Sequence, residues 1–406
     1  MNFFGIAVFA LLTTSLLAGE NWPGFRGYGT SSSKATGLPT LWSEDKVAWH
    51  VDLAGYGQSS PVIWDETVFV TSASGDQKQT LTVQAFNLKD GIVRWKSEVL
   101  ATQRPEKVSD MISRSAPTPV VDEANVYAFY ESGDLLCIDH VGAIQWQRQL
   151  TKEYGDFKGV HGVGSSLVRT PDHLVLLIDH SGPSYLLCLD KKTGDNVWKV
   201  EREERVSWTT PLYHDHGGIK QVIISSNGVA ESYALADGQQ LWKFTGIEKN
   251  TVASPSVSDD LVIVGSSSPR HSLAIKLGGK GDVTETHLKW RAESATSSFG
   301  SPLIHGDVVY FVNRAGVLHA NRLSDGTSLW KYRLPASTWA SPLSTPEHLY
   351  FFCKDGQTVV IKPREDGPEI IATNVLKVEE KDRHYGYAIS KDAIIMRTEK
   401  SLVCLR

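Results

Sequence analysis

Short apolar runs alternate with polar turns along almost the whole of the 406-residue chain. Residues 299–332, FGSPLIHGDVVYFVNRAGVLHANRLSDGTSLWKY, show this arrangement most clearly. They contain an apolar strand after Gly-Ser-Pro, a second strand after Gly306-Asp307, a third that ends at Ala320 and a fourth that carries Trp330. Short apolar runs bounded by turn residues predict β-strands. We interpret this stretch as one four-stranded unit of a repeat.

Tryptophan recurs at the same place in seven of the units, and Ile371 takes its place in another. The spacings are 46, 51, 52, 44, 48 and 40 residues, as expected for propeller blades of four strands. In five of the seven units a Gly stands four residues before the Trp, as Gly326 does before Trp330. Such a Gly fits the tight turn between the third and fourth strands, and the flat indole can pack on the neighbouring blade. The recurring residues are Trp49, Trp95, Trp146, Trp198, Trp242, Trp290 and Trp330.

The starts of the first strands repeat as well. Most combine a small residue with Pro, and Pro in a strand is tolerated only where its missing N–H faces away from a partner. We therefore assign these residues to the innermost strands, whose free edges face the central channel. The eight starts are Ser60-Pro61, Ala116-Pro117, Ser166-Leu167, Thr210-Pro211, Ser254-Pro255, Ser301-Pro302, Ser341-Pro342 and Tyr387-Ala388.

The two ends of the chain each hold part of a unit. Only 35 residues follow Ile371, enough for three strands at 387–390, 393–398 and 401–405, and residues 46–53 form a lone strand that can supply the fourth. Pairing strands from both ends closes the ring. The predicted fold is all-β: an eight-bladed β-propeller of four-stranded antiparallel blades, closed by the N- and C-terminal strands. Its predicted parts are a signal peptide (1–18), an irregular lead-in (19–45) and the propeller (46–406).

Composition and charge narrow the possible partners. The hydrophobic content of 41% is ordinary for a soluble globular protein, and the net charge of −5 argues against binding to polyanions, so we expect no nucleic-acid partner. Residues 3–18 are apolar and are followed by Ala18-Gly19, a pattern typical of a secretory signal peptide. We expect export to the periplasm or the extracellular space, with an uncleaved membrane anchor as the alternative. No later segment is apolar enough to cross a bilayer.

The repeat resembles that of the PQQ-like β-propellers. The resemblance rests on the strand starts spelled SSP, ASP and GSP, on the turns KTGDNVW and SDGTSLW, and on the small third-strand residues Ala85, Cys188, Ala234 and Ala320. It covers roughly residues 46–406. This family includes quinoprotein alcohol dehydrogenases, an outer-membrane assembly lipoprotein and many exported bacterial proteins. The resemblance is specific for the fold, whereas one fold hosts many functions.

The enzymes of that family carry marks that this chain lacks. They often have a disulfide between adjacent cysteines, and some have a C-x-x-C-H haem site; neither pattern occurs here. No residues map with confidence onto their Glu, Asn and Asp ligands for Ca²⁺. We therefore expect no cofactor and no catalytic residues. PQQ with Ca²⁺ is expected only under the alternative of a quinone-dependent oxidoreductase.

The Cys and His residues have structural interpretations. Cys137, Cys188 and Cys404 occupy third-strand positions that hold Ala in other units, and Cys353 follows an apolar second strand. A Cys that alternates with Ala behaves as a small buried residue, so we expect four free thiols. The sequence His214-Asp215-His216 precedes two glycines, and we interpret it as a solvated turn, not as a metal site. No metal site is expected elsewhere.

Topology gives the best pointer to a binding site. The loops before each first strand and those joining second to third strands share one face, which we call the long-loop face because it carries the connections 97–114, 151–164 and 373–385. Long loops at the mouth of a propeller bind ligands and partners. We count back three positions from the Pro of each predicted strand start, or from the residue in its place. The residues found there are predicted to form a ring at this mouth, namely Gln58, Arg114, Gly164, Trp208, Val252, Phe299, Trp339 and Tyr385.

Half of that ring is aromatic, which suits stacking on a flat ligand, a sugar or an apolar side chain. The predicted ligand or partner site comprises Gln58, Arg114, His161, Trp208, Phe299, Arg314, Trp339 and Tyr385. The alternative is that the aromatic residues simply plug the channel. The leading functional hypothesis is a non-enzymatic envelope propeller that binds a protein or polymer on this face. A quinoprotein oxidoreductase and a carbohydrate-binding or carbohydrate-active propeller are the alternatives.

Overall fold

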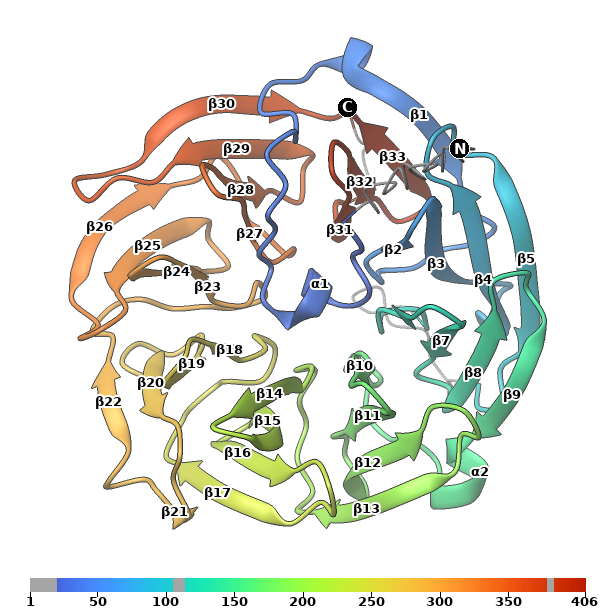
Figure 1. The fold of residues 1–406 in the computed structure, drawn as a ribbon, viewed down its shortest axis with the longest axis horizontal. Coiled ribbons are helices and arrows are strands. Elements are labelled where there is room, and N and C mark those ends of the chain that lie inside the picture. Colours follow the sequence, from blue (N-terminus) through green and yellow to red (C-terminus); the bar gives the residue numbers. More distant parts are fainter. Residues whose placement is uncertain (1–19, 105–113, 378–382) are drawn as a thin grey trace, which may run out of the picture.

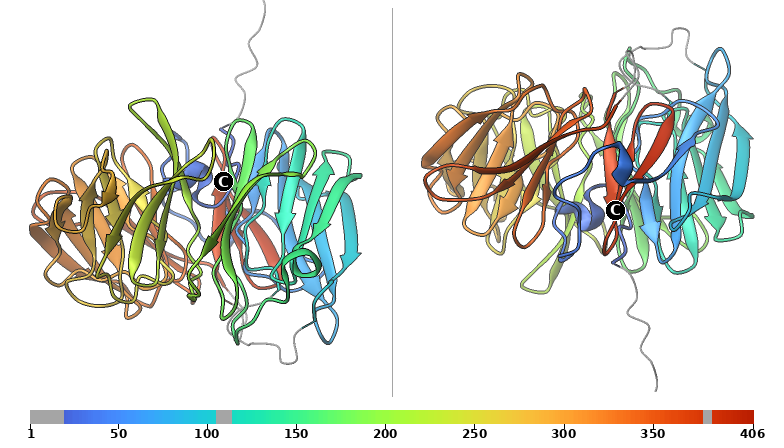
Figure 2. Two further views of the ribbon diagram at one scale, coloured as in Figure 1. Left: turned by 90° about the horizontal axis from the view of Figure 1, so that it is seen from below. Right: turned by 90° about the horizontal axis from the view of Figure 1, so that it is seen from above.

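The computed structural model describes residues 20–104, 114–377 and 383–406. The predicted signal peptide, residues 1–18, lies outside these ranges. Within them, no helix is long and apolar enough to span a membrane. Eight sheets surround a central axis, as Figure 1 shows, and the side views in Figure 2 show a flattened ring. The prediction of an eight-bladed all-β propeller is confirmed.

Each blade takes its number from its place in the chain. Blade one contains β2 (Val62–Trp64), β3 (Thr67–Ser74), β4 (Thr80–Asn87) and β5 (Val93–Leu100). Blade two contains β6 (Val120–Val121), β7 (Asn125–Phe129), β8 (Asp134–Asp139) and β9 (Ile144–Gln149), followed by α2 (Leu150–Tyr154). Blade three contains β10 (Val168–Arg169), β11 (His173–Ile178), β12 (Ser184–Asp190) and β13 (Asn196–Arg202). Blade four contains β14 (Leu212–His216), β15 (Ile219–Ser226), β16 (Val229–Ala234) and β17 (Gln240–Thr245).

The second half of the ring repeats the plan. Blade five contains β18 (Ser256–Val257), β19 (Leu261–Val264), β20 (Leu273–Lys276) and β22 (Leu288–Arg291). Blade six contains β23 (Leu303–His305), β24 (Val308–Val312), β25 (Val317–Arg322) and β26 (Ser328–Arg333). Blade seven contains β27 (Leu343–Ser344), β28 (Leu349–Phe352), β29 (Gln357–Lys362) and β30 (Glu369–Val375). Blade eight contains β31 (Gly386–Ile389), β32 (Ile394–Arg397), β33 (Ser401–Leu405) and β1 (Val47–Asp52).

Blade eight is built from both ends of the chain, as predicted. β1 pairs antiparallel with β33, and Trp49 lies opposite Cys404. In Figure 1 the first strand (blue) lies beside the last (dark red). Both faces of the middle strands are covered by neighbouring blades, so β32 and β33 are buried at every position. The outer strands alternate between exposed and partly buried residues, because only one of their faces packs on another blade.

The recurring Trp side chains join each blade to the next. The Trp49 ring packs over Gly91, where a Cβ would lie only 2.8 Å from the indole, and Gly91 has a φ of 71° that also favours glycine. The indole N–H donates to the Leu88 carbonyl at 3.0 Å. Equivalent bonds are made by Trp95, Trp146, Trp198, Trp290 and Trp330.

Within the described ranges, Trp242 makes no equivalent hydrogen bond. In blade five a longer connection between β20 and β22 replaces the tight turn that accepts this bond in other blades. There β21 (Gly281–Asp282) adds to the outer edge of β17 as a parallel strand, and Gly281 lies opposite Trp242. The Trp242 indole nitrogen is buried and has no hydrogen-bond partner among the described residues. The prediction of four strands therefore fails at this edge of blade four, which has five.

A chain of hydrogen bonds runs around the axis at the first strands. In each case a backbone N–H donates to the Ser or Thr hydroxyl of the next blade, at 2.9 to 3.1 Å. This explains the small hydroxyl residue before most of the prolines. The bonds run from Ser60 to Thr118, Thr118 to Ser166, Ser166 to Thr210, Thr210 to Ser254, Ser254 to Ser301, and Ser301 to Ser341.

Two of the eight predicted strand starts are in the wrong register. In blade two the bonded hydroxyl belongs to Thr118, so the start is Thr118-Pro119 and not Ala116-Pro117. In blade eight Ala388 pairs with Ile395, which places the start at Gly386-Tyr387, one residue earlier than predicted. Blade two has Pro at both 117 and 119, and blade eight has no Pro, so the sequence pattern alone was ambiguous there.

The lead-in crosses the end of the channel that is opposite the long-loop face. It contains α1 (Arg26–Gly29), a tight turn with positive φ at Arg26 and Gly27, and η1 (Glu44–Lys46). Figure 1 shows α1 near the centre of the ring. The buried Arg26 guanidinium donates to the carbonyls of Pro255 and Pro302 at 2.9 and 3.1 Å. The lead-in therefore fills part of the axis at this end of the channel.

Candidate functional site

The structure shifts two members of the predicted mouth ring. With the corrected strand starts, the symmetric position is held by Ala116 in blade two and by His384 in blade eight. Arg114 and Tyr385 lie two residues and one residue away from it along the chain. The positions that share one place in all eight blades are Gln58, Ala116, Gly164, Trp208, Val252, Phe299, Trp339 and His384.

Three aromatic side chains nevertheless form a continuous row. The centroids of Phe299 and Trp339 are 5.2 Å apart, and those of Trp339 and Tyr385 are 5.7 Å apart. These residues come from the loops before blades six, seven and eight. Phe299 and Trp339 are half-buried, whereas Tyr385 is 8% exposed. Tilted rings at these distances stabilise one another and leave part of their surface to a ligand.

Hydrogen bonds extend the row into blade one. The Tyr385 hydroxyl lies 3.3 Å from the Tyr56 hydroxyl and donates to Glu399 at 2.7 Å. Gln58 donates its amide N–H to the Tyr56 hydroxyl at 3.4 Å. Burial raises the pKa of both Tyr56 and Tyr385. We call Phe299, Trp339, Tyr385 and Tyr56 the aromatic arc.

Cations lie over two rings of the aromatic arc. The Lys78 ammonium is 4.5 Å from the centroid of the Tyr56 ring, and the Arg383 guanidinium is 5.1 Å from that of Trp339. Both distances are in the range of cation–π attraction. The sequence prediction missed Tyr56, Lys78 and Arg383, because they stand outside the repeat position used to find the ring. The sequence GYGQ that ends in Gln58 was the available signal for Tyr56.

Trp208 belongs to a separate group on the other side of the mouth. Its indole N–H donates to the Gly162 carbonyl at 3.0 Å, and its ring centroid is 6.1 Å from that of His161. A Cβ at Gly164 would lie 2.9 Å from the indole, so Gly allows this close approach. Among the described residues, no ring contact joins Trp208 to the aromatic arc. The predicted convergence of four aromatic residues is therefore only partly realised.

The predicted arginines do not join the aromatic arc. Arg114 is buried, and its guanidinium donates to the Gln103 carbonyl. Burial lowers the pKa of Arg114, while Glu131 and Asp134 act in the opposite direction. Arg314 is exposed, and its backbone N–H donates to Ser298. Gln58, His161, Trp208, Phe299, Trp339 and Tyr385 belong to the two groups described above. Among the described residues, neither arginine makes a side-chain hydrogen bond or ring contact with either group.

Two buried ionisable residues, Glu131 and His384, lie near the mouth. Oε2 of Glu131 is buried without a partner among the described residues, and burial raises the pKa of this carboxyl well above its usual value. Burial lowers the pKa of His384 to about 4, while a hydrogen bond with the Gly386 backbone acts in the opposite direction. Burial thus disfavours the charged form of both groups.

The described residues contain no cluster of metal-binding side chains, because nowhere among them do three or more His, Cys, Asp or Glu side chains gather so that they could hold a metal ion. Cys137, Cys188, Cys353 and Cys404 are free and buried, as predicted, and burial raises their pKa values to about 12, 12, 11 and 12. We derive no catalytic step through a quinone.

The His214-Asp215-His216 sequence is not a turn, contrary to the prediction. These residues end β14, and the two His rings stack at 6.1 Å. The turn follows at Gly217 and Gly218, whose φ values of 58° and 82° make a tight reversal that allows the strand to continue to His216.

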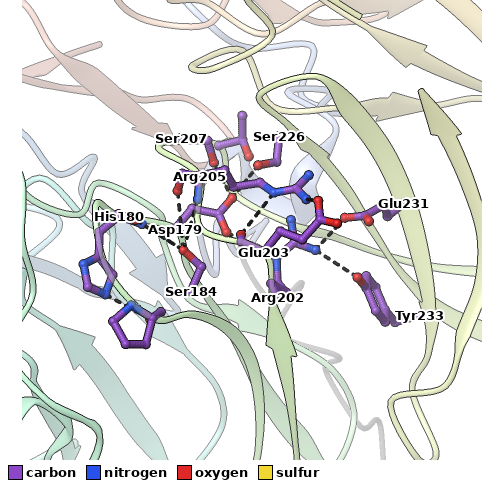
Figure 3. Close-up of polar contacts among 12 residues, drawn as sticks. Asp179, His180, Ser184, Arg202, Glu203, Arg205, Ser207, Ser226, Glu231 and Tyr233 are labelled. Atoms are coloured by element: carbon purple, nitrogen blue, oxygen red, sulfur yellow. Dashed lines mark hydrogen bonds and ion pairs between the residues drawn. The ribbon is translucent and has the colours of Figure 1, made fainter. Parts of the chain in front are cut away.

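The densest cluster of charges serves the packing of blades three and four. Figure 3 shows Arg202 between Asp179 and Glu231, at 3.2 and 2.6 Å. Arg202 also donates to the Tyr233 hydroxyl at 3.0 Å, and Ser207 donates to Asp179 at 2.7 Å. The two carboxylates and the guanidinium are almost fully buried. Because the charges are paired and enclosed, we assign this cluster a structural role.

Comparisons with known proteins agree with the fold. The family model described as outer membrane protein assembly factor BamB matches residues 32–188 and 182–346. The BamB proteins of Shewanella oneidensis and Moranella endobia are each 22% identical to this chain, over 289 and 278 residues. The matches cover 69% and 68% of this chain but just under two thirds of the relatives, 65% and 64%.

Three solved structures share the architecture. The crystal structure of BamB from Moraxella catarrhalis has a TM-score of 0.63 at 14% identity and covers 89% of this chain and 97% of its own. The designed protein Ika8 has a TM-score of 0.64 at 11% identity, with coverages of 89% and 100%. The quinohemoprotein alcohol dehydrogenase ADHIIG of Pseudomonas putida HK5 has 0.63 at 10%, with coverages of 95% and 80%. At these identities the structures show the fold alone. Because the family model matches well over half of the chain, the protein belongs to the PQQ-like propeller family described as outer membrane protein assembly factor BamB.

Proposed function

We propose that this protein is a non-enzymatic propeller of the cell envelope that acts as a scaffold in the assembly of outer-membrane proteins. Its partner is an envelope protein that binds the long-loop face. The family match and the names of the two curated relatives support the pathway. The apolar sequence of residues 3–18 supports export.

The aromatic arc is the observation that carries this proposal. Its partly exposed members Phe299 and Trp339 are in ring contact, and Tyr385 links Trp339 to partly exposed Tyr56. Binding energy in protein interfaces concentrates in a few aromatic and Arg side chains near the centre, and the surrounding residues exclude water. Arg383 over Trp339 adds a polar group of the kind found in such centres.

The test uses the mature chain as bait in envelope extracts, with bound proteins identified by mass. We expect outer-membrane assembly proteins to be captured, and the Trp339→Ala and Phe299→Ala variants to lose at least about tenfold in affinity for the captured partner. Val141→Ala is the matched control, because Val141 is an apolar residue, 79% exposed, in a turn between third and fourth strands, away from the arc.

Other outcomes would reject the proposal. If the aromatic residues only plug the channel, Trp339→Ala lowers the free energy of unfolding by about 3 to 5 kcal/mol and leaves capture intact at low temperature. Dye-linked alcohol oxidation after addition of PQQ and Ca²⁺ would show an oxidoreductase. Capture of glycans in place of proteins would show a carbohydrate-binding propeller.

A further inference from the structure

A second site lies at the other end of the axis, where the lead-in leaves a gap. The lead-in covers the free edges of several innermost strands by main-chain pairing. Trp22 exchanges two hydrogen bonds with Ile63 of blade one, both 2.9 Å long. Pro23 accepts from the backbone N–H of Val121 in blade two, also at 2.9 Å.

The lead-in also pairs with a strand on the far side of the channel, here in parallel and not antiparallel as at Ile63. In blade seven, Ser344 donates to the Ser31 carbonyl and accepts from the Ser33 N–H, each at 2.9 Å. Blades five and six are covered by Arg26, whose guanidinium binds the carbonyls of Pro255 and Pro302. The innermost strands therefore present main-chain groups to the axis, and the lead-in shows that an extended chain can pair with them.

Blades three and four are left without such a cover. Strand pairing places Arg169 and Tyr213 at the positions that Ile63 and Val121 hold in blades one and two. Within the described residues, the main-chain groups of Arg169 and Tyr213 make no hydrogen bond toward the lead-in. Leu167 stands where the other blades from one to seven have Pro, so blade three offers an additional inward N–H at this level.

These edges face a cavity of about 170 Å³. Its walls include the apolar side chains of Val120, Leu167, Leu212 and Phe25, and Tyr28 at its lining is 62% exposed. A cavity of about 150 Å³ is enough to hold benzene. The space therefore accommodates one medium-sized apolar side chain beside the unpaired edges.

We propose that the inner edges of blades three and four bind one residue of an extended segment of a partner polypeptide. The two peptide groups that flank this residue pair with Leu167, Arg169 and Tyr213, and its apolar side chain occupies the cavity. The pairing mode is the one that the lead-in uses on blades one, two and seven. This site is independent of the aromatic arc and lies at the opposite end of the channel.

The probe is N-acetyl-leucine N′-methylamide, which carries one apolar side chain between two peptide groups. We expect saturable shifts of the backbone ¹H and ¹⁵N resonances of Leu167, Arg169 and Tyr213 in the millimolar range. An analogue methylated at both nitrogens cannot donate hydrogen bonds, and we expect it to bind at least about tenfold more weakly. Equal affinity of the two compounds would overturn main-chain pairing and leave only an apolar cavity.

Two variants test the site from the side of the protein. Leu167→Pro gives blade three the residue found in its neighbours and removes one donor, so affinity is expected to fall about fivefold. Leu212→Trp fills the cavity and is expected to abolish binding, whereas Ile304→Trp, on the innermost strand of blade six, is the control and retains it. Each variant is first checked for a cooperative thermal transition, and the two compounds remain decisive if a variant fails to fold.

Failure here is distinguishable from failure of the proposed function. The absence of saturable shifts, or shifts confined to residues of the aromatic arc, would refute this site without touching capture through Trp339. Loss of capture in Trp339→Ala with intact shifts at Arg169 and Tyr213 would support both sites separately.

Discussion

At the scale of the residue, His384 shows how packing at the mouth lowers the pKa of a side chain. It is 1% exposed and lies edge-on to Phe352, with ring centroids 5.3 Å apart. The imidazolium form would lose its hydration there, and this loss lowers the pKa to about 4. His319 is buried in the same way, and burial also lowers its pKa to about 4.

This predicts a loss of stability in mild acid. The unfolded chain binds a proton at His384 below pH 6.5, whereas the folded chain does so only below about pH 4, so stability is complete above the first value and falls between them. The shift corresponds to about 3 kcal/mol for this residue. Urea unfolding from pH 7 to 4 measures the effect, and His384→Leu is expected to flatten the curve. Parallel curves for the two proteins would contradict the assignment, since His319 contributes equally to both.

The tryptophans allow a matched comparison between blades. Trp198 donates to the Leu235 carbonyl at 2.8 Å, whereas the buried Trp242 nitrogen has no partner in the described chain. Replacing either residue with Phe removes a similar volume, but only Trp198→Phe leaves a carbonyl without its donor. We expect Trp198→Phe to lower the free energy of unfolding by about 1 kcal/mol more than Trp242→Phe. Chemical denaturation of both variants measures the difference, and equal losses would show that the indole bond contributes nothing.

At the scale of the element, the innermost strands were predictable because Pro marks them. The carbonyls of Pro255 and Pro302 point to the axis, so their missing N–H would have had no partner within the blade. The pattern failed where it was ambiguous or absent, at Pro117 and Pro119 in blade two and in the proline-free blade eight. Register there depends on pairing with the second strand, which a repeat pattern alone does not specify.

The lead-in could not be derived from the sequence for a different reason. Its contacts join residues hundreds of positions apart, such as Arg26 with Pro255 and Pro302, and it has no periodicity that reports them. Arg26 is positioned by a backbone with φ of 59°, which is rare outside glycine. Tyr56 of the aromatic arc and Arg383, which lies over Trp339, were missed for a similar reason, since each belongs to a loop and not to the repeat.

Arg26 is expected to hold the lead-in in place. Its guanidinium makes four hydrogen bonds, to Ser31, Pro255, Ser256 and Pro302. Arg26→Ala should lower the free energy of unfolding by about 3 kcal/mol, because buried carbonyls lose a charged donor. Arg26→Lys should recover only part of this, since an ammonium lacks the planar fork. The exposed Arg314→Ala is the control, and an equal effect of the two Ala variants on the urea midpoint would refute the role.

At the scale of the whole molecule, the ring depends on one joint between distant parts of the chain. β1 pairs with β33 along its length, and the fully buried Arg397 of β32 donates to Ser59 and Thr71 of blade one. Every pair of neighbouring blades is joined by the continuous chain. The pairing of β1 with β33 inside blade eight is what closes the ring. Removing the terminal strand at either end of the sequence is therefore expected to destabilise the whole ring.

Truncation can isolate the contribution of the first strand. A chain that begins at residue 46 and one that begins at residue 54 both lack the lead-in, and they differ only by β1 and its flanks. We expect the shorter chain to melt at least about 5 °C lower, because β33 loses its partner and exposes an edge. Scanning calorimetry measures this difference. Identical melting temperatures would show that β1 is dispensable for closure.

The shared blade also sets an order on biosynthesis. β1 ends at Asp52, and the strand that receives it begins at Ser401. At about 5 to 20 residues per second, the ribosome reaches the second strand roughly 20 to 70 s after the first. During this interval the propeller ring cannot close, and the polypeptide remains incompletely folded, which is the state that a secretion channel accepts. The closed propeller can form only when β1 and β33 are in the same compartment.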